Sequence, residues 1–500
     1  MNGIPRLWWM ALLRIGAGTM IGILAMAGAL PGARAEMLPW RTFQLSDPLN
    51  SGERAARLIP GDHQPSCSHV DVSQRLSIGN VVVASLCHNP DTRAAYLRLV
   101  AEGARYASNY SGYLPTVTAT TSRSRATSFG ENTKNSAVSS NYGLALGLTL
   151  YDFGQREFRL ETAEFALLAA GHGYNATIQG TIAAALQAYY SLLRAQSAVE
   201  VAADAERFAR ESYEAAQLRH QIGQVPLADV LQAKGGHSQA ILRSQAATNG
   251  LALQQASLAQ LMGFSADTPV VVTEVDDGSL ALDPFEDQLS ELMRMARSKR
   301  QDLLATQASL KASEQSLKAL RRSNLATISA TASSFAANDS IDLFGPGGSR
   351  NNAIGVSVSI PIFTGFVQTY NERAAEKELQ AQKEALTRRE LSVEQDVWNA
   401  WHNYETAKQQ WVTSEDQMVS AVQLKDVALG RYKEGLGSIL DVLNAQLQYS
   451  TALQIQLESR YNLFATRVDL IRAVGVLTLN TLQHDVMVTL IPPQHTATRR

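Results

Sequence analysis

Two stretches of the chain alternate large apolar residues with small ones. In residues 141–154 tyrosine and leucine stand at every second position, with glycine, alanine or threonine between them. Residues 352–365 repeat the pattern, with isoleucine and valine alternating with glycine, serine and proline. A period of two is the spacing of a β-strand whose two faces differ. The pattern predicts two strands, each with one apolar face and one face of small residues.

A very long helical pattern follows each of these strands. The first helix is predicted from Gln155 to near Ile222, which is about 100 Å at the rise of an α-helix, and it breaks at residues 223–226. A second helix is predicted over residues 227–262. After the later strand, a long helix is predicted to end near Lys433, before a glycine-rich break at residues 435–437. Upstream, residues 77–108 are predicted to form helices, with Pro90 opening the second of them.

The chain contains an internal duplication. Asp302 repeats Asp91, residues 324–331 repeat 113–120, and residues 440–445 repeat 228–233, always with an offset of 211 or 212 residues. A constant offset over half the chain is typical of a tandem repeat of one structural unit. Each unit is predicted to contain a helix, a β-hairpin, a very long helix, a break and a further helix. The hairpins are expected to carry long polar loops at residues 123–140 and 337–351.

The two-faced strands are typical of a membrane β-barrel, with apolar residues outward and small or polar residues inward. A soluble two-faced sheet is the alternative. Four strands cannot close a barrel, and an open edge is not tolerated in lipid, so we expect several copies to assemble. The long helices are too polar for lipid, and their alanine-rich segments favour close helix packing in water. An interfacial girdle is expected from the aromatic residues near the strand ends: Tyr110, Tyr113, Tyr142, Tyr151, Phe153, Phe363 and Phe366.

The N-terminus predicts export. Two arginines precede the apolar run of residues 15–30, and Ala33-Arg34-Ala35 offers a small-x-small cleavage site, so residues 1–35 are predicted to be a signal peptide. A single N-terminal anchor is the alternative. Removal of three arginines takes the formal charge of −2 to −5, and no basic surface suggests nucleic acid. No later run of about 18 apolar residues predicts a transmembrane helix.

The only two cysteines of the sequence, Cys67 and Cys87, lie in the exported part. A disulfide between them is expected in an oxidising compartment, with two free thiols as the alternative. His63, His69 and His88 lie nearby, but their spacing matches no standard zinc site, so no metal is predicted. The sequence contains none of the common catalytic motifs, and we expect neither an enzyme nor a cofactor.

The chain resembles the TolC family of outer-membrane exit ducts over residues 76–475. The residues that carry the resemblance are the duplicated hairpins, their exits at residues 150–154 and 361–365, and the segments 431–435 and 439–445. The resemblance implies an α+β membrane protein: a trimeric 12-stranded β-barrel, four strands per subunit, continued by a periplasmic α-helical barrel. The implied domains are an irregular extension (36–75), a first repeat (76–264), a linker (265–286), a second repeat (287–475) and a C-terminal tail (476–500).

The resemblance also implies a periplasmic gate. Asp441 matches the entrance aspartate of the family, and three copies around a threefold axis would make an anionic ring that favours cations. The family often has a second aspartate one helical turn on, where this chain has Asn444, so the ring is expected to be weaker. Ser438 and Asp441 also fit a helix capping box, which is a structural role compatible with the gate.

Two further residues match a pair that the family uses to tie neighbouring coils shut, namely Tyr432 and Asp229. Their structural alternatives are an ordinary surface tyrosine and an acidic first helical turn that follows Pro226 at the first helical position. The family arginine between that tyrosine and the entrance aspartate is replaced by Gly437, so the gate is expected to be looser or tied differently. The helix tips that would dock the partner comprise Gly223, Val225, Pro226, Gly435, Gly437 and Ser438.

The implied partners are two further copies of the chain, a periplasmic adaptor protein, an inner-membrane ABC or other exporter, and outer-membrane lipid. Residues 86–93, preceded by Cys67, are similar to the CyaE-like branch associated with type I protein secretion. Drug efflux is the alternative with the same architecture. A surface adhesin or structural stalk is an alternative of another class.

Overall fold

The computed structural model describes residues 74–130, 133–273, 289–341 and 345–477, which belong to the unit formed by Leu49–Arg500. The predicted signal peptide, most of the predicted extension with Cys67, the second part of the predicted linker and nearly all of the predicted tail lie outside these residues. Among the helices that the structure describes, none combines the length and the apolarity needed to cross a membrane.

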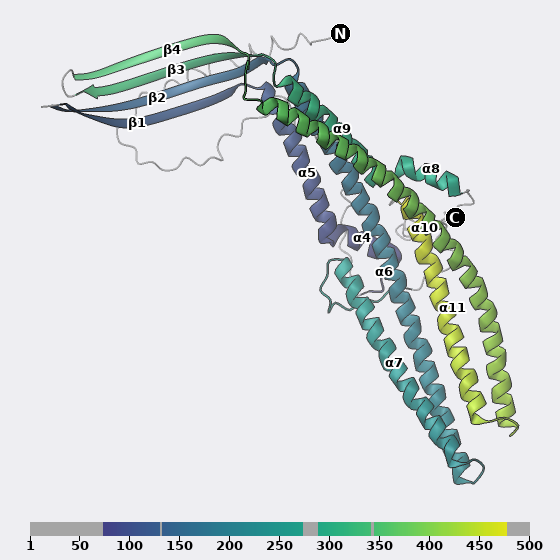
Figure 1. Cartoon of the computed structure of the whole chain (residues 1–500). Coiled ribbons are helices and arrows are strands. Elements are labelled where there is room, and N and C mark those ends of the chain that lie inside the picture. Colours follow the sequence, from purple (N-terminus) through teal and green to yellow (C-terminus); the bar gives the residue numbers. More distant parts are fainter. Residues whose placement is uncertain (1–73, 131–132, 274–288, 342–344, 478–500) are drawn as a thin grey trace, which may run out of the picture. The chain divides into compact units, whose positions relative to one another are not determined.

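The helices of the two repeats correspond in order and in length (Figure 1). In the first repeat α4 (Ile78–His88) and α5 (Pro90–Tyr110) precede the strands, and α6 (Gln155–Gln221) and α7 (Leu227–Leu261) follow them. In the second repeat α8 (Leu289–Lys299) and α9 (Gln301–Arg322) precede the strands, and α10 (Val367–Lys433) and α11 (Ile439–Val474) follow them. Both α6 and α10 contain 67 residues. The predicted long helices and the internal duplication are confirmed.

The strands form one antiparallel sheet in the order β1-β2-β3-β4. Their bounds are Thr116–Gly130 for β1, Thr133–Tyr151 for β2, Thr327–Ile341 for β3 and Gly345–Ser359 for β4. Most of residues 123–140 and 337–351 therefore lie in strands, and the prediction of long loops there was wrong. These polar residues satisfy their backbone groups by pairing across the hairpins, and such pairing needs no apolar face.

The register gives the sheet one apolar face and one face of small residues, as predicted. Across the sheet, Val117 pairs with Leu146, Leu146 with Ala332, and Ala332 with Ile354. On the opposite face Gly143 lies beneath the ring of Phe335, and an added Cβ atom would lie 2.5 Å from that ring. Glycine is therefore needed at position 143, where the ring of Phe335 covers the small-residue face.

The strand exits are held in a corresponding way in both repeats. At the start of α6, Arg156 donates to Asp152 (3.0 Å) and to the backbone carbonyls of Gly112 and Thr149 (3.1 and 2.9 Å). Gln368 lies 212 residues later, at the start of α10, and donates to the Leu320 carbonyl and to Ser323 Oγ, both at 2.7 Å. The first turn of α6 is thus tied to the short 3-10 turn after α5 (Ser111–Tyr113) and to β2, and the first turn of α10 is tied to the end of α9.

Shorter helices stack end to end beside the long ones. Gly263, two residues after the end of α7, has a φ of 78°, and an added Cβ would lie 2.4 Å from the His88 carbonyl oxygen. Asn89, which caps α5, donates to the Leu261 carbonyl at 3.0 Å. In the second repeat an added Cβ on Gly475 (φ 81°) would lie 2.9 Å from the Cα atom of Arg300, the residue before α9. These contacts join α7 to α4–α5 and α11 to α9.

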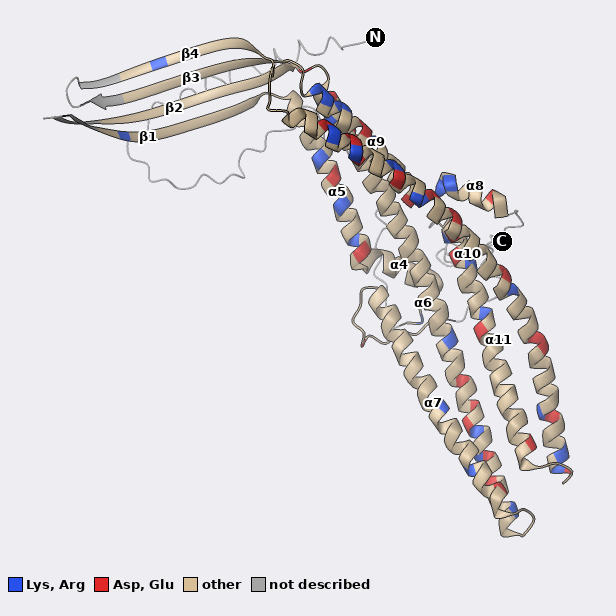
Figure 2. Ribbon diagram, in the orientation of Figure 1, with Lys and Arg blue, Asp and Glu red and all other residues tan. Residues whose placement is uncertain are grey.

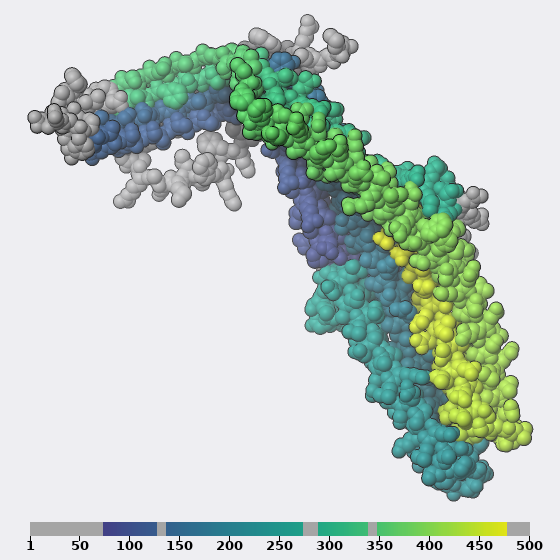
Figure 3. All heavy atoms as spheres, in the orientation of Figure 1, coloured from purple at the N-terminus to yellow at the C-terminus, as the bar shows by residue number. Residues whose placement is uncertain are grey.

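The hydrophobic core changes in character along the helices. Around α4 and the middle of α6 it is built from large residues, including the fully buried Tyr189 and Tyr190, whose hydroxyl pKa values burial raises. Towards the tips, the buried residues of α6, α7, α10 and α11 include pairs of alanines seven residues apart: Ala209 and Ala216, Ala233 and Ala240, Ala421 and Ala428, Ala445 and Ala452. A heptad of small residues lets helix backbones approach closely in a left-handed coiled coil. Figure 3 shows α10 packed alongside α11, in accord with their extensive contact.

Candidate functional site

The turn between α6 and α7 is the first of two helix tips. Gly223 has a φ of 77°, a left-handed conformation that glycine adopts without strain. Pro226 is the N-cap of α7, with a ψ of 159°, so the prediction of Pro226 at the first helical position was wrong. Its extended ψ places it just outside the helix. His220 Nδ1 donates to the carbonyl of Val225 (2.9 Å), which closes the turn.

The turn between α10 and α11 is the second tip. Gly435 has a φ of 75° and ends α10, and Ser438 is the N-cap of α11. A Cβ atom on Gly437 would lie 3.3 Å from both Arg431 Cβ and the Tyr432 amide nitrogen. Glycine at position 437 therefore lets the turn fold back directly onto the last turn of α10.

Asp441 completes the predicted capping box. The Ser438 amide donates to Asp441 Oδ2 and the Asp441 amide donates to Ser438 Oγ, both at 3.1 Å. The hydrogen bonds from Ser438, backbone first, and the charge of Arg431 hold the pKa of Asp441 below its ordinary value. The side chain is exposed. The carboxylate is therefore ionised and open to solvent, as a cation-attracting ring requires, and it also caps the helix.

Asn444, one helical turn beyond Asp441, is exposed and lies beside a small cavity. That cavity, of about 170 Å³, lies between α6, α7 and α11 and is lined by Phe208, Gly236, Arg243 and Leu443 among others. Asn444 therefore faces a groove between helices of the two repeats.

Tyr432 is buried, with 8% of its surface exposed, rather than an ordinary surface tyrosine. The guanidinium of Arg219, in the last turn of α6, lies 4.3 Å from the centre of its ring. Its hydroxyl makes no hydrogen bond within the described part of this chain, to Asp229 or to any other residue. Within a single chain Tyr432 thus links the two tips through Arg219, and its polar end has no partner.

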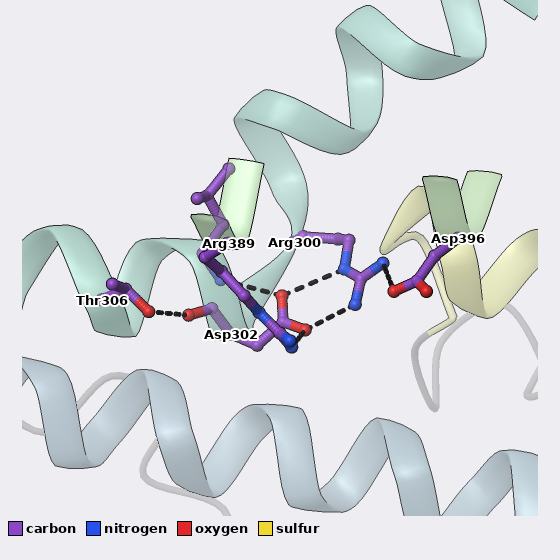
Figure 4. Close-up of polar contacts among 6 residues, drawn as sticks. Arg300, Asp302, Thr306, Arg389 and Asp396 are labelled. Carbon is purple, nitrogen blue, oxygen red and sulfur yellow. Dashed lines mark hydrogen bonds and ion pairs between the residues drawn. The ribbon is translucent and has the colours of Figure 1, made fainter. Parts of the chain in front are cut away.

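A charged cluster that the sequence did not reveal lies where α11 meets α9 (Figure 4). Arg300 donates two hydrogen bonds to Asp302 (3.0 and 2.6 Å) and one to Asp396 on α10 (2.7 Å), and Arg389 on α10 pairs with the same carboxylate of Asp302. Burial opposes ionisation of Asp302, but these bonds and the two arginine charges outweigh it and lower its pKa. The cluster fixes the start of α9 to α10.

A cavity of about 420 Å³ adjoins this cluster, with walls from α6, α9, α10 and α11. Asp469 of α11 lies on its wall and accepts a hydrogen bond from Gln187 of α6 (2.6 Å). Burial raises the pKa of Asp469, against the lowering effect of Arg472 and Gln187. Two carboxyl groups of one cavity therefore have pKa values shifted in opposite directions.

Comparisons with known proteins identify the family. The model of the family described as "Outer membrane efflux protein" matches residues 81–264 and 292–476. The chain belongs to this outer membrane efflux protein family. It is similar to Protein CyaE of Bordetella pertussis, at 27% identity over 89% of this chain and 96% of that protein, and to the outer membrane efflux protein BepC of Brucella suis, at 26% over 68% and 73%. Its fold is similar to that of the Campylobacter jejuni CmeC outer membrane channel, with a TM-score of 0.69 and 19% identity over 82% of this chain and 89% of that one.

Membership of the outer membrane efflux protein family confirms the predicted resemblance and fold class. It places the chain in the outer membrane as a transport channel, with its long helices on the periplasmic side, and family members are passive channels. The two matched segments correspond to the two repeats. The roles of the individual tip residues remain predictions.

Cys87, on α4, is half-buried and disulfide-bonded. Its predicted partner Cys67 lies outside the described residues, so the pairing of the two remains a prediction. Among the described residues, no group of histidine, cysteine or acidic side chains is arranged to hold a metal ion.

A comparison of equivalent positions in the two repeats, rather than the pattern of apolar residues, could have indicated the charged cluster. Under the repeat offset of 211, Arg300 corresponds to Asn89, which caps α5 in the first repeat. The second repeat has thus replaced a neutral cap by an arginine. Such a difference in charge between equivalent positions could have marked the junction.

Proposed function

We propose that this protein is the outer-membrane exit duct of a tripartite exporter that carries out type I protein secretion. The observation that carries the proposal is the similarity to CyaE, which extends over 96% of that protein's length, against 73% for BepC. The segment that resembles the CyaE-like secretion branch, residues 86–93, lies at the junction of α4 and α5.

The working unit in this proposal is a homotrimer. The strands β1 and β4 are the edges of the sheet, and an edge in a membrane must be paired. In addition, α10 exposes apolar side chains at heptad-related positions: Leu391 at 62%, Trp398 at 51%, Val412 at 59% and Val419 at 58%. This stripe is separate from the alanine heptad that contacts α11. An exposed apolar heptad supports packing against a helix of a neighbouring subunit.

The helix tips are proposed as the gate and the docking site for a periplasmic adaptor, which in turn contacts an inner-membrane exporter. Three copies of Asp441 would form an anionic ring at the entrance. The burial of Tyr432, with its hydroxyl unpaired in the single chain, supports a polar partner for it on a neighbouring subunit, where Asp229 is the expected acceptor.

Small-molecule efflux is the second candidate function. Several similar proteins are named as efflux proteins, including BepC and a toluene efflux pump outer membrane protein of Pseudomonas putida. The two candidates share the duct and differ in cargo, which the inner-membrane partner selects.

The test compares the secreted proteins of a parent strain, a deletion strain and a complemented strain by mass spectrometry. Loss of one or a few large proteins from the medium, restored by complementation, is the expected result and names the cargo. An unchanged set of secreted proteins, together with increased sensitivity to dyes, detergents or antibiotics, would establish efflux instead. Absence of ion conductance in planar bilayers would contradict both and favour a structural stalk.

A further inference from the structure

Among the described side chains of the strands, positive charge lies on one face of the sheet. Among the described strand side chains, the charged ones are Arg123 and Arg125 on β1 and Arg350 on β4, and all three are exposed. In the parts of the strands that Figure 2 colours by residue type, blue occurs on β1 and β4 and there is no red.

The register places these arginines on the apolar face. Successive residues of a strand point to opposite faces, so Arg123 and Arg125 share the face of Val117. On β4, Arg350 likewise shares the face of Ile354 and Val356, the exposed apolar residues of that strand. The adjacent residues of the same two strands, which point to the opposite face, are polar and uncharged: Ser122, Ser124, Ser349 and Asn351. The one acidic residue in the strand sequences, Asp339, pairs with Ser139 and so falls outside the rows that hold the arginines.

The arginines lie at the outer end of the apolar band. Val358 is the last apolar residue of β4 on the side of the helices, and Arg123 belongs to the row of Gly348, ten residues nearer to the hairpin end. At about 3.3 Å per residue and a tilt of about 40°, ten residues rise about 25 Å, the height of the apolar band of a membrane barrel. Arg350 is in the row of Tyr142, an exposed aromatic residue. The arginines thus lie at the level where the lipid headgroups begin, at the hairpin end of the sheet. This is the end away from the periplasmic helices.

The two strands that carry the arginines are the two edges of the sheet. In the proposed trimer, β4 of one subunit lies beside β1 of the next, so the arginines gather at the seam between subunits. We propose that Arg123 and Arg125 of one subunit and Arg350 of its neighbour bind the phosphate groups of the phosphorylated glycolipid in the outer leaflet. The inference rests on the proposed homotrimer and on the outer-membrane orientation of the family.

The chemistry of the site favours this ligand. A guanidinium is planar and binds phosphate oxygens with two parallel hydrogen bonds, and it remains charged at an apolar boundary. Arginines facing a barrel lumen would meet cargo, but these three share the face of the lipid-exposed valines and isoleucines. A membrane headgroup is therefore the anion that this face meets.

The experiment measures lipid retained by the full-length protein in nanodiscs of phosphatidylethanolamine that contain either diphosphorylated lipid A or its dephosphorylated form. Native mass spectrometry reports both the trimer mass and the number of bound lipid A molecules. We expect the wild type to retain diphosphorylated lipid A, and the triple variant Arg123→Gln/Arg125→Gln/Arg350→Gln to retain about tenfold less, because charge-assisted hydrogen bonds are lost. Dephosphorylated lipid A should bind both proteins equally weakly.

Two controls separate this site from general charge effects. Arg210→Gln removes an exposed arginine from α6 and should leave retention unchanged. Adding Ser124→Arg to Arg123→Gln/Arg125→Gln restores a charge on the opposite face of β1 and should not restore retention. Equal retention by the wild type and the triple variant would overturn the inference, as would displacement of lipid A by inorganic phosphate alone, which indicates a generic anion site. A wild-type protein that is not trimeric would contradict the proposed function instead.

Discussion

At the residue scale, Asp441 has two roles that a pair of substitutions can separate. Asp441→Asn removes the charge, so we expect lower cation selectivity of single channels in planar bilayers. Ser438→Ala removes the cap but keeps the carboxylate, so we expect a loss of about 1 kcal/mol in helix stability with selectivity unchanged. Unchanged selectivity in Asp441→Asn would show that the residue is only a cap.

Tyr432 allows a similar separation of packing from hydrogen bonding. Tyr432→Phe keeps the ring on Arg219 and removes a hydroxyl that has no partner in the single chain, so thermal stability should hardly change. If the hydroxyl ties neighbouring subunits, the same variant should increase channel conductance. Tyr432→Ala should cost about 3 kcal/mol because it also removes the buried ring. Unaltered conductance in Tyr432→Phe, at wild-type stability, would exclude the tie.

Gly263 tests the close stacking of helix ends. Gly263→Ala meets both a positive φ and the His88 carbonyl, and we expect a destabilisation of about 3 kcal/mol. Gly435→Ala has a nearly equal φ of 75° but no atom within 4 Å of the added Cβ, so it should cost only about 1 kcal/mol. Thermal unfolding of both variants in detergent gives the comparison. Equal costs would mean that the backbone conformation, and not the helix contact, requires glycine.

At the scale of elements, the two carboxyl groups of the junction cavity should respond oppositely to substitution. Asp302→Asn leaves Arg300 and Arg389 without their shared partner, and we expect a loss of about 3 kcal/mol. Asp469→Asn removes a charge that burial disfavours and keeps an acceptor for Gln187, so stability should change by less than about 0.5 kcal/mol.

The pH dependence follows from the same shifts. The lowered pKa of Asp302 means that its contribution to the free energy of unfolding is present above its ordinary pKa. That contribution is lost as the pH falls through the pKa of the folded state. The raised pKa of Asp469 has the opposite effect on the pH dependence. Its contribution to the free energy of unfolding is present below its ordinary pKa and is lost as the pH rises through the pKa of the folded state. The Asp302→Asn variant should therefore lose less stability than the wild type between neutral and acid pH. A steeper acid loss in the variant would contradict this assignment.

The elements differed in how far the sequence predicted them. The 67-residue helices were predictable because their ends carry glycine and proline and their apolar positions repeat regularly. The outer halves of the hairpins were not, since residues such as Arg123 and Asn338 are polar and gain their strand conformation only from a paired neighbour. The cluster of Arg300, Asp302 and Arg389 joins residues from separate elements, and a pattern read along one element does not show such contacts.

At the scale of the whole molecule, assembly should depend on the exposed apolar stripe of α10. Val419→Asp places a charge in that stripe without touching the alanine heptad against α11, so we expect fewer trimers with the subunit fold retained. Ser420→Asp introduces the same charge at the adjacent exposed position and should assemble as the wild type does. Native mass spectrometry in detergent measures the fraction of trimer, and a wild-type fraction in Val419→Asp would exclude this stripe from the subunit contact.

The equal length of α6 and α10 has a consequence for how such a protein can change. The helices α6 and α10 each run from the sheet to a helix tip, and they have the same number of residues, about 100 Å of helix. The two helical hairpins of each chain therefore extend the same distance into the periplasm. A heptad inserted into α6 and α7 alone would leave the tips at different heights, and the proposed adaptor would meet only half of them. A change in the length of the helices must therefore occur in both repeats together. The distance between the two membranes thus constrains the helix lengths of the two repeats jointly.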